Sequence, residues 1–559
     1  MATNRDPPES ELLPTNSAGR LLEGRPLVGL VMVLLVTGGH TMNLRETGES
    51  QGWVAAEVYT LQSFYLVSLA LAMLACPALA RRWSCRTLAL AGLVMGTAGG
   101  LLNGIEVWLS LSAFLIGRVL AGIGAGLVIY ATPHLLDPRW HVVLAWAVIL
   151  CPVAGPGAVA LASMTSETSD WQHGFLIEGA ACATGLVALL SMGRRPEVPP
   201  RAPRASLAYL PPLVVASAAA LYALHWGQLH GWLESPDIEV AFALAAGSLA
   251  LALWLAWPYL EWALLAENWP RLVLFFFGGT CQFFYGYIMN TYGGTIVNLS
   301  SWQRAWLIWP LPIGMALGFA LSRLYVRCGF SLLGLPGAVV GLVLLSAGFF
   351  MCQYVTMEWP YWDVRTIVEL NWFQSPGTWE LAPGRSLMGL GISLFMVAMD
   401  GLASRDAERE ERVRSLLQVV QFFGGGIAAA VLINFLIIGH KVHYSYSAER
   451  DTIQADELVR HTELLRTELH DVGQPSPEHS ARVLLYRFIN NEASNLVFAT
   501  IYALFGLTAL ALAGLIAAVW ILRLMHGIAR RAPPGRDGSA YSPVARSGNS
   551  PAEARPYAR

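Results

Sequence analysis

Fourteen long apolar segments recur from one end of the chain to the other, and they restrict its fold more than any other feature. A bilayer core about 30 Å thick is crossed by roughly 20 apolar residues in a helix. The predicted spans are residues 25–43, 54–79, 87–105, 108–131, 142–163, 174–192, 206–228, 238–260, 270–296, 303–323, 331–354, 384–403, 413–438 and 495–524. The sequence therefore predicts an all-α membrane protein with fourteen transmembrane helices.

Arginine placement predicts the orientation of these spans, because short loops rich in positive charge stay on the cytoplasmic side. Arginines gather in alternate connections, and the connections between them hold few. The arginine-rich connections and the two ends of the chain, which we expect on the cytoplasmic side, contain Arg20, Arg25, Arg81, Arg82, Arg86, Arg139, Arg194, Arg195, Arg201, Arg204, Arg271, Arg323, Arg327, Arg405, Arg409, Arg412, Arg414, Arg523, Arg530 and Arg531. Arg304, Arg365 and Arg385 are scattered exceptions on the outer side. We therefore expect both termini to be cytoplasmic.

Three segments lie outside the spans. Residues 1–24 and 532–559 are rich in Pro, Ser, Gly and Arg, and we expect both to be disordered cytoplasmic tails. The outer segment 440–494 contains a thin helical stripe of leucines, Leu458, Leu465 and Leu469, between residues 452 and 469. Two interpretations remain for that segment: a solvated helical cap, or a docking surface for a partner protein.

Composition excludes several classes of function. Only 13% of the residues are charged and the formal net charge is −2, so no basic surface is available for nucleic acid. Lys441 is the only lysine, which excludes a GxxxxGK[ST] phosphate-binding loop. His440 and His443 lack further ligands at metal-binding spacing, and no nucleophile elbow or HExxH motif occurs. We therefore expect that the protein is not an enzyme and that it binds neither a cofactor nor a metal ion.

Two short motifs connect the spans to a known superfamily. The connection after the second span contains Arg81 and Arg82 within Pro77-Ala-Leu-Ala-Arg-Arg-Trp-Ser-Cys-Arg86 and resembles the major facilitator loop motif. The fourth span contains Arg118-Val-Leu-Ala-Gly122-Ile-Gly124-Ala-Gly126, which resembles the R-x-x-x-G-x-G-x-G motif of the same superfamily. These glycines also match a dinucleotide fingerprint, but no strand precedes them, so close helix packing is favoured.

Further segments resemble the fourteen-helix drug:proton antiporter branch of that superfamily. Gly155-Pro156-Gly157 in the fifth span resembles the G-P-x-x-G-G element of antiporters. Three other segments match branch patterns in order: Trp171–Glu178, Pro383–Gly391 and Gln421–Gly426. The resemblance implies a six-helix bundle at residues 25–193, two inserted helices at 206–265, and a second six-helix bundle at 269–526.

The same resemblance places the substrate between the bundles near the bilayer midplane, close to spans one, four, nine and twelve. Arg118 is the strongest candidate there, because a charge within the membrane is costly and is retained for a reason. Its alternative role is to bind neighbouring backbone carbonyls. In the ninth span, Gln282, Tyr285 and Asn290 could line a cavity for amphipathic solutes, or could simply pack against neighbours.

Proton coupling needs a titratable group at membrane depth. The first span has His40 but no acid between residues 27 and 42, where the branch has an aspartate. Glu178 and Asp400 are the alternative acids. Glu178 is preferred because its sequence neighbours include no charged partner, so desolvation should favour its protonated form. A structural role for Glu178, as a helix cap or a snorkelling acid, remains the competing interpretation.

These observations predict a secondary active transporter of the inner membrane. The resemblance implies export of amphipathic organic compounds in exchange for protons by alternating access, with a periplasmic adaptor protein as a possible partner. The alternative is a non-transporting relative that uses the same fold as a receptor or scaffold. The incomplete loop motif and the missing acid of the first span motivate that alternative.

Overall fold

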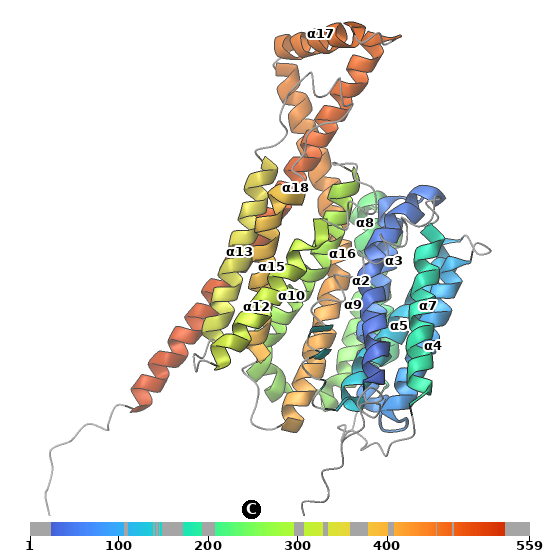
Figure 1. Ribbon diagram of the computed structural model, residues 1–559, viewed down its shortest axis with the longest axis vertical. Coiled ribbons are helices and arrows are strands. Elements are labelled where there is room, and N and C mark those ends of the chain that lie inside the picture. Colours follow the sequence, from blue (N-terminus) through green and yellow to red (C-terminus); the bar gives the residue numbers. More distant parts are fainter. Residues whose placement is uncertain are drawn as a thin grey trace, which may run out of the picture.

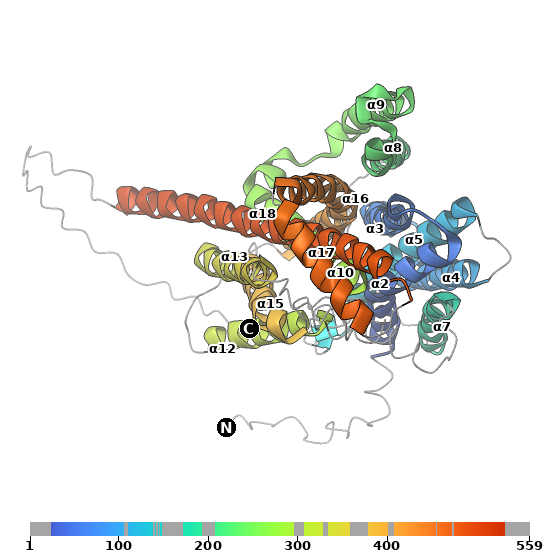
Figure 2. The same cartoon turned by 90° about the horizontal axis from the view of Figure 1, so that it is seen from above.

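The computed structural model describes residues 24–105, 110–137, 140, 143–144, 146–147, 171–192, 207–295, 307–327, 334–357, 378–400, 407–453, 455–471 and 475–531. Every regular element within these ranges is a helix. Ten of the described helices are long and apolar enough to cross a membrane. The helices form two groups and a hairpin that stands apart in the view from above (Figure 1 and Figure 2). The predicted all-helical membrane fold is therefore confirmed.

The N-terminal bundle contains the first group of helices. They are α2 (Arg25–Gln51), α3 (Ala55–Leu79), α4 (Cys85–Gly104), α5 (Leu111–Leu135) and α7 (Trp171–Leu190). Helix α5 packs on α3 and α4, and α7 packs on α2 and α4. The predicted span 142–163, with its Gly155 and Pro156, lies almost entirely outside the described residues.

The C-terminal bundle contains six described helices. They are α10 (Trp262–Thr295), α12 (Pro310–Arg327), α13 (Leu335–Met357), α15 (Thr378–Asp400), α16 (Ala407–Ile453) and α18 (Pro477–Arg531). Helix α15 packs between α12 and α13, and α10 packs on α16. The apolar interiors of both bundles belong to one continuous buried cluster.

An inserted hairpin lies beside the two bundles. It consists of α8 (Leu210–His230) and α9 (Pro236–Ala256), with the short 3-10 helices Trp232–Glu234 and Trp257–Tyr259 after them. The hairpin turns at Gly231, whose φ of 77° lies in the left-handed region that glycine adopts without strain. Helix α9 packs on α8 and is otherwise exposed, and Figure 2 shows it as the outermost helix on that side.

Two helices of the C-terminal bundle continue far beyond the others and carry a crosspiece. Helices α16 and α18 project together from one end of the bundles, and α17 (Ala455–Asp471) joins their tips (Figure 1). We call this projection the tower, and the end of the bundles that bears it the tower side. Leu465 and Leu469 of α17 are buried and α17 packs on α18. The predicted leucine stripe is therefore used, at these two positions, to hold the tower together.

The two bundles repeat one packing scheme built on glycines. In the N-terminal bundle, Gly124 of α5 faces Gly92 of α4 so closely that a Cβ on Gly124 would lie 2.4 Å from the Gly92 carbonyl oxygen. In the C-terminal bundle, Gly391 of α15 faces Gly341 of α13, and its Cβ would lie 2.5 Å from the Gly341 carbonyl oxygen. Arg118 precedes Gly124 by six residues, and Arg385 precedes Gly391 by six. The R-x-x-x-G-x-G motif is thus present once in each half.

Apart from span 142–163, each predicted span coincides with a described helix, and the largest differences are at the helix ends. Helix α15 begins at Thr378, not at residue 384, so Arg385 lies two turns inside it. The prediction placed Arg385 at the first turn of this span, and the helix begins earlier because the residues before it continue the helix. Helices α16 and α18 also extend well beyond the predicted 413–438 and 495–524 into polar sequence.

A reporter experiment tests the expected orientation. A reporter fused after Arg204 should be active only in the cytoplasm, and one inserted beside Gln474 should be active only outside, because the arginine-bearing connections stay inside. Alkaline phosphatase and a fluorescent protein report the two sides. Finding both positions on the same side would contradict the arrangement of fourteen helices.

Candidate functional site

A buried ion pair lies within the N-terminal bundle. The guanidinium of Arg118 on α5 donates from Nη2 to Oε2 of Glu178 on α7, at 2.8 Å. The side chain of Arg118 is fully buried and that of Glu178 is 3% exposed. Charged groups at such burial are retained only when paired, since an isolated ion would lose its hydration without compensation. The structure thus brings together two residues that were separate candidates in the sequence.

Aromatic rings enclose the guanidinium side of the pair. The central carbon of Arg118 lies 4.4 Å from the ring centroid of Phe175 and 5.7 Å from that of Phe114. These two rings meet edge to face, with centroids 4.9 Å apart. Val58 and Leu61 of α3 complete the apolar surroundings. The cation therefore has favourable ring faces in place of water.

A hydroxyl pair extends this polar site toward α2. The hydroxyls of Thr37 on α2 and Tyr65 on α3 are 2.8 Å apart and hydrogen bonded, and Thr37 also donates to the carbonyl of Val33 at 2.8 Å. Tyr65 lies within electrostatic reach of both Arg118 and Glu178. Four helices of one bundle therefore contribute a polar side chain each to two buried hydrogen-bonded pairs.

The pairing changes the expected chemistry of Glu178. The sequence neighbours of Glu178 include no charged partner, but α5 brings Arg118 to the carboxylate although 60 residues separate them in the chain. A proton on Glu178 would remove the charge of the acid and leave the arginine cation uncompensated. A neutral Glu178 is therefore costly as long as the Arg118 guanidinium keeps its place beside it.

Several other predicted residues are placed only by their helices. His40 lies in α2, and Gln282, Tyr285 and Asn290 lie in α10. Asp400 is the last residue of α15. Their side chains are outside what the structure describes, so their roles in the cavity or in coupling stay predictions.

The loop motif after α3 contacts the end of α7 through its last arginine. Arg81 and Arg82 are exposed in the turn that follows α3. Arg86, at the end of the motif, instead donates to the carbonyl oxygen of Met192 at 2.6 Å, directly after α7. In the described structure the motif therefore fixes the end of α7 through its last arginine.

The glycines of the fourth span are confirmed as packing residues. A Cβ on Gly122 would lie 2.3 Å from the carbonyl oxygen of Tyr65, and one on Gly126 would lie 2.4 Å from that of Leu69. Both of these neighbours belong to α3. Glycine is needed here because backbone atoms of the two helices occupy the space of any side chain.

The structure also shows buried charges that the sequence analysis did not select. Arg385 is fully buried and donates from Nη1 to the carbonyl oxygen of Leu307 at 2.6 Å. Its signal was available, because Arg385-x-x-x-Gly-x-Gly repeats the pattern that begins at Arg118. Arg271 of α10 binds both carboxylate oxygens of Glu410 on α16, at 2.6 and 3.2 Å. No spacing in the sequence indicated that second pair.

The bundles meet across their seam at more than one level. On the tower side the hydroxyl of Tyr59 on α3 is hydrogen bonded to that of Thr291 on α10. Farther from the tower, the rings of Trp146 and Phe319 make an edge contact with centroids 5.0 Å apart. These contacts join one bundle to the other and must change if the bundles rock.

Comparison with solved structures identifies the arrangement. A POT family transporter in complex with 5-aminolevulinic acid superposes with a TM-score of 0.55 at 13% identity, covering 90% of this chain and 98% of its own. A structure described under proton dependent oligopeptide transporters gives 0.54 at 14%, covering 89% and 97%. The nucleoside transporter NupG gives 0.52 at 10%, covering 88% and 99%. The chain has the major facilitator fold.

Sequence comparison adds no closer assignment. No protein-family model matches the chain, and no curated protein matches it. At identities of 10–14%, the solved structures establish the shared fold and leave the substrate open.

Proposed function

We propose that the protein is a secondary active transporter of the fourteen-helix drug:proton antiporter branch, which exports amphipathic organic compounds by alternating access. The fold supports transport, because a major facilitator fold provides two bundles that can rock about a midplane site. The branch and the direction of export are supported by the sequence resemblances. The single observation that carries proton coupling is the buried pair of Arg118 and Glu178.

The pair can couple proton binding to movement in the following way. With Glu178 ionised, its attraction to Arg118 ties α7 to α5 inside the N-terminal bundle. A proton taken up by Glu178 removes that attraction, and the freed guanidinium then forms hydrogen bonds with other acceptors. Helix α5 also contacts α3, which reaches the C-terminal bundle through Tyr59. A change at the pair is therefore passed to the seam.

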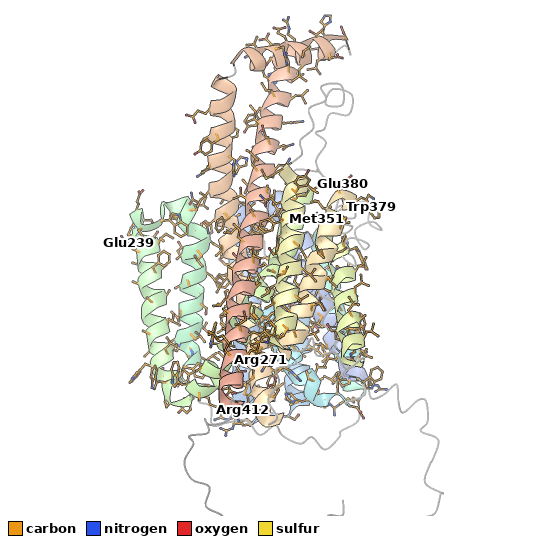
Figure 3. All side chains as sticks on the ribbon, turned by 90° about the vertical axis from the view of Figure 1, so that its left-hand side faces the viewer. Glu239, Arg271, Met351, Trp379, Glu380 and Arg412 are labelled. Atoms are coloured by element: carbon orange, nitrogen blue, oxygen red, sulfur yellow. The ribbon has the colours of Figure 1, made fainter. Side chains whose placement is uncertain are left out.

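Flux measurements in liposomes test this proposal. The purified protein should move an amphipathic cation such as ethidium faster when a pH gradient is imposed. Glu178→Gln, which keeps the shape but cannot titrate, should lose that acceleration while still binding the solute. Glu239→Gln, a change at an exposed acid that begins α9 (Figure 3), should behave as the original protein. An unchanged response to the gradient in Glu178→Gln would remove this acid from coupling, and no flux at all would favour the receptor or scaffold alternative.

We also propose that the tower serves export in cells by offering a weak contact to a periplasmic adaptor, with the protein in the inner membrane and both termini cytoplasmic. The tower carries exposed Val459 and Leu464 on α17, and Tyr446 and Tyr486 on the helices beneath it. Such a small apolar surface suits a transient contact.

Deletion of part of the tower separates transport from adaptor contact. Removing residues 452–469 should leave flux in liposomes unchanged and reduce drug resistance in cells. Resistance and flux are measured on the same variant. Equal loss in both assays would show a folding role for α17, and no loss in either would exclude a role in export.

A further inference from the structure

The inserted helix α8 lies across the seam between the two bundles. It packs on α3 of the N-terminal bundle and on α16 of the C-terminal bundle, whereas α9 packs on α8 (Figure 2). One apolar cluster joins all three helices, with Val67 of α3, Leu221 of α8 and Ala430 of α16 at its centre. A helix that only filled space in the membrane could pack on one bundle alone, whereas α8 contacts both.

Two buried polar contacts fix α8 to the bundles. The ring nitrogen Nε2 of His225 is hydrogen bonded to the hydroxyl of Ser63 on α3 at 2.9 Å. The amide of Asn434 on α16 donates to the carbonyl oxygen of Leu224 at 2.6 Å. Ser63, His225 and Asn434 are 0%, 1% and 8% exposed. Consecutive residues of α8 are thus bound to opposite bundles, and we call this arrangement the strap contact.

The strap contact lies on the tower side of the seam. Ser63 follows Tyr59 by one helical turn on α3, and Tyr59 is the residue that reaches Thr291 of the C-terminal bundle. Gly426 of α16 also lies close to α3 there, since a Cβ on it would be 3.3 Å from the carbonyl oxygen of Ser63. Opening of the tower side would pull Ser63 and Asn434 apart, and α8 cannot follow both.

The contact is also incompletely satisfied, which suits one that is made and broken. Among the described residues, His225 Nδ1 and Asn434 Oδ1 are buried without a hydrogen-bond partner. Buried polar atoms of this kind lower the stability of a permanent interface. Breaking such a contact costs less free energy than breaking a fully hydrogen-bonded one. Once the helices separate, the unpaired atoms can form hydrogen bonds with water or with groups of another conformation.

We propose that α8 is a strap that stabilises the closed tower side of the seam, and that Ser63 or Asn434 must leave it each time this side opens. The proposal rests on the alternating access of the proposed function. In this proposal the inserted hairpin sets the equilibrium between the closed and open states of the tower side. Neither the substrate nor Glu178 takes part in the strap contact.

Distance measurements between spin labels test the strap. The labels replace Val54 at the start of α3 and Trp379 at the start of α15, both exposed (Trp379 is labelled in Figure 3). The five described cysteines are buried, and Cys151 and Cys328 are changed to serine. The original protein should give mainly the short distance of a closed tower side. His225→Phe and Asn434→Leu should each raise the open fraction about fivefold, as expected for one lost hydrogen bond.

Three further variants make the test specific. Ser63→Ala removes the same bond as His225→Phe without a larger side chain, so it should have the same effect, and combining the two should add little. Tyr222→Leu changes a partly exposed residue of α8 that stacks on Trp226 of the same helix, and should leave the distances unchanged. Unchanged distances in Ser63→Ala and Asn434→Leu, or an equal shift in Tyr222→Leu, would overturn the strap.

This readout does not depend on transport. A shift in distance without any solute flux in liposomes would support the strap and contradict the proposed transport. Flux driven by a pH gradient, together with distances that no strap variant alters, would support the proposed transport and contradict the strap.

Discussion

Replacing Arg118 by alanine should lower solute flux in liposomes at least about 100-fold, because the change leaves Glu178 buried without its cation at a cost of about 3–5 kcal/mol. Arg118→Lys should keep no more than about a tenth of the activity, since lysine retains the charge but loses the planar fork and its fit between two aromatic rings. Flux, membrane insertion and thermal stability are measured on each variant.

Two comparisons decide whether Arg118 acts in transport or only in folding. The double variant Arg118→Gln with Glu178→Gln removes both charges, so it should recover stability but not transport driven by a pH gradient. Arg323→Ala removes an exposed arginine that also lies over an aromatic ring, that of Phe319, and should leave flux nearly unchanged. Recovery of gradient-driven flux in the double variant would show that the pair is structural.

Replacing Gly389 by alanine should remove most of the folded protein from the membrane fraction. The added Cβ would lie 2.0 Å from the carbonyl oxygen of Leu311 and 2.9 Å from the amide nitrogen of Met315, so α12 and α15 would have to separate. Overpacking usually costs 1–3 kcal/mol, and a clash with backbone leaves little room for relief. Size-exclusion profiles and melting temperatures in detergent measure the loss.

The matched control for Gly389 is Gly514→Ala on α18. No atom lies within 4 Å of the added Cβ at Gly514, so alanine should be neutral or slightly stabilising, as expected for a glycine inside a helix. Gly122→Ala in the other bundle should behave like Gly389→Ala, because its Cβ would lie 2.3 Å from the carbonyl oxygen of Tyr65. A normal melting temperature for Gly389→Ala would show that α12 and α15 pack less closely than described.

The sequence predicted the features that depend on local composition. Apolar length located each long apolar helix that the structure describes, and the motif at Arg118 indicated both close packing and a buried charge. Gly122 and Gly126 illustrate why this works: a small residue at helical spacing is needed wherever two backbones touch, so the spacing itself carries the information.

The features that depend on tertiary contact were not predicted. Glu178 appeared isolated because its partner is 60 residues away in the chain, and only the packing of α7 beside α4 and α2 brings it near Arg118. The start of α15 was predicted six residues too late, at residue 384, because helix propensity at polar residues is a weak signal. The lengths of α16 and α18 were underestimated for the same reason, because both helices continue beyond their apolar residues into polar sequence.

The tower gives the C-terminal bundle a long mechanical arm. Helix α16 contains 47 residues, and at 1.5 Å per residue it is about 70 Å long. With the pivot at the bilayer midplane, the part of α16 on the tower side forms an arm of about 40 Å, and a rotation of about 10° would carry its tip sideways by roughly 7 Å. Because α17 joins the tips of two helices from the same bundle, it should follow that bundle in such a rotation. Under the proposed alternating access, the position of α17 would therefore report from the end of the tower which side of the seam is open.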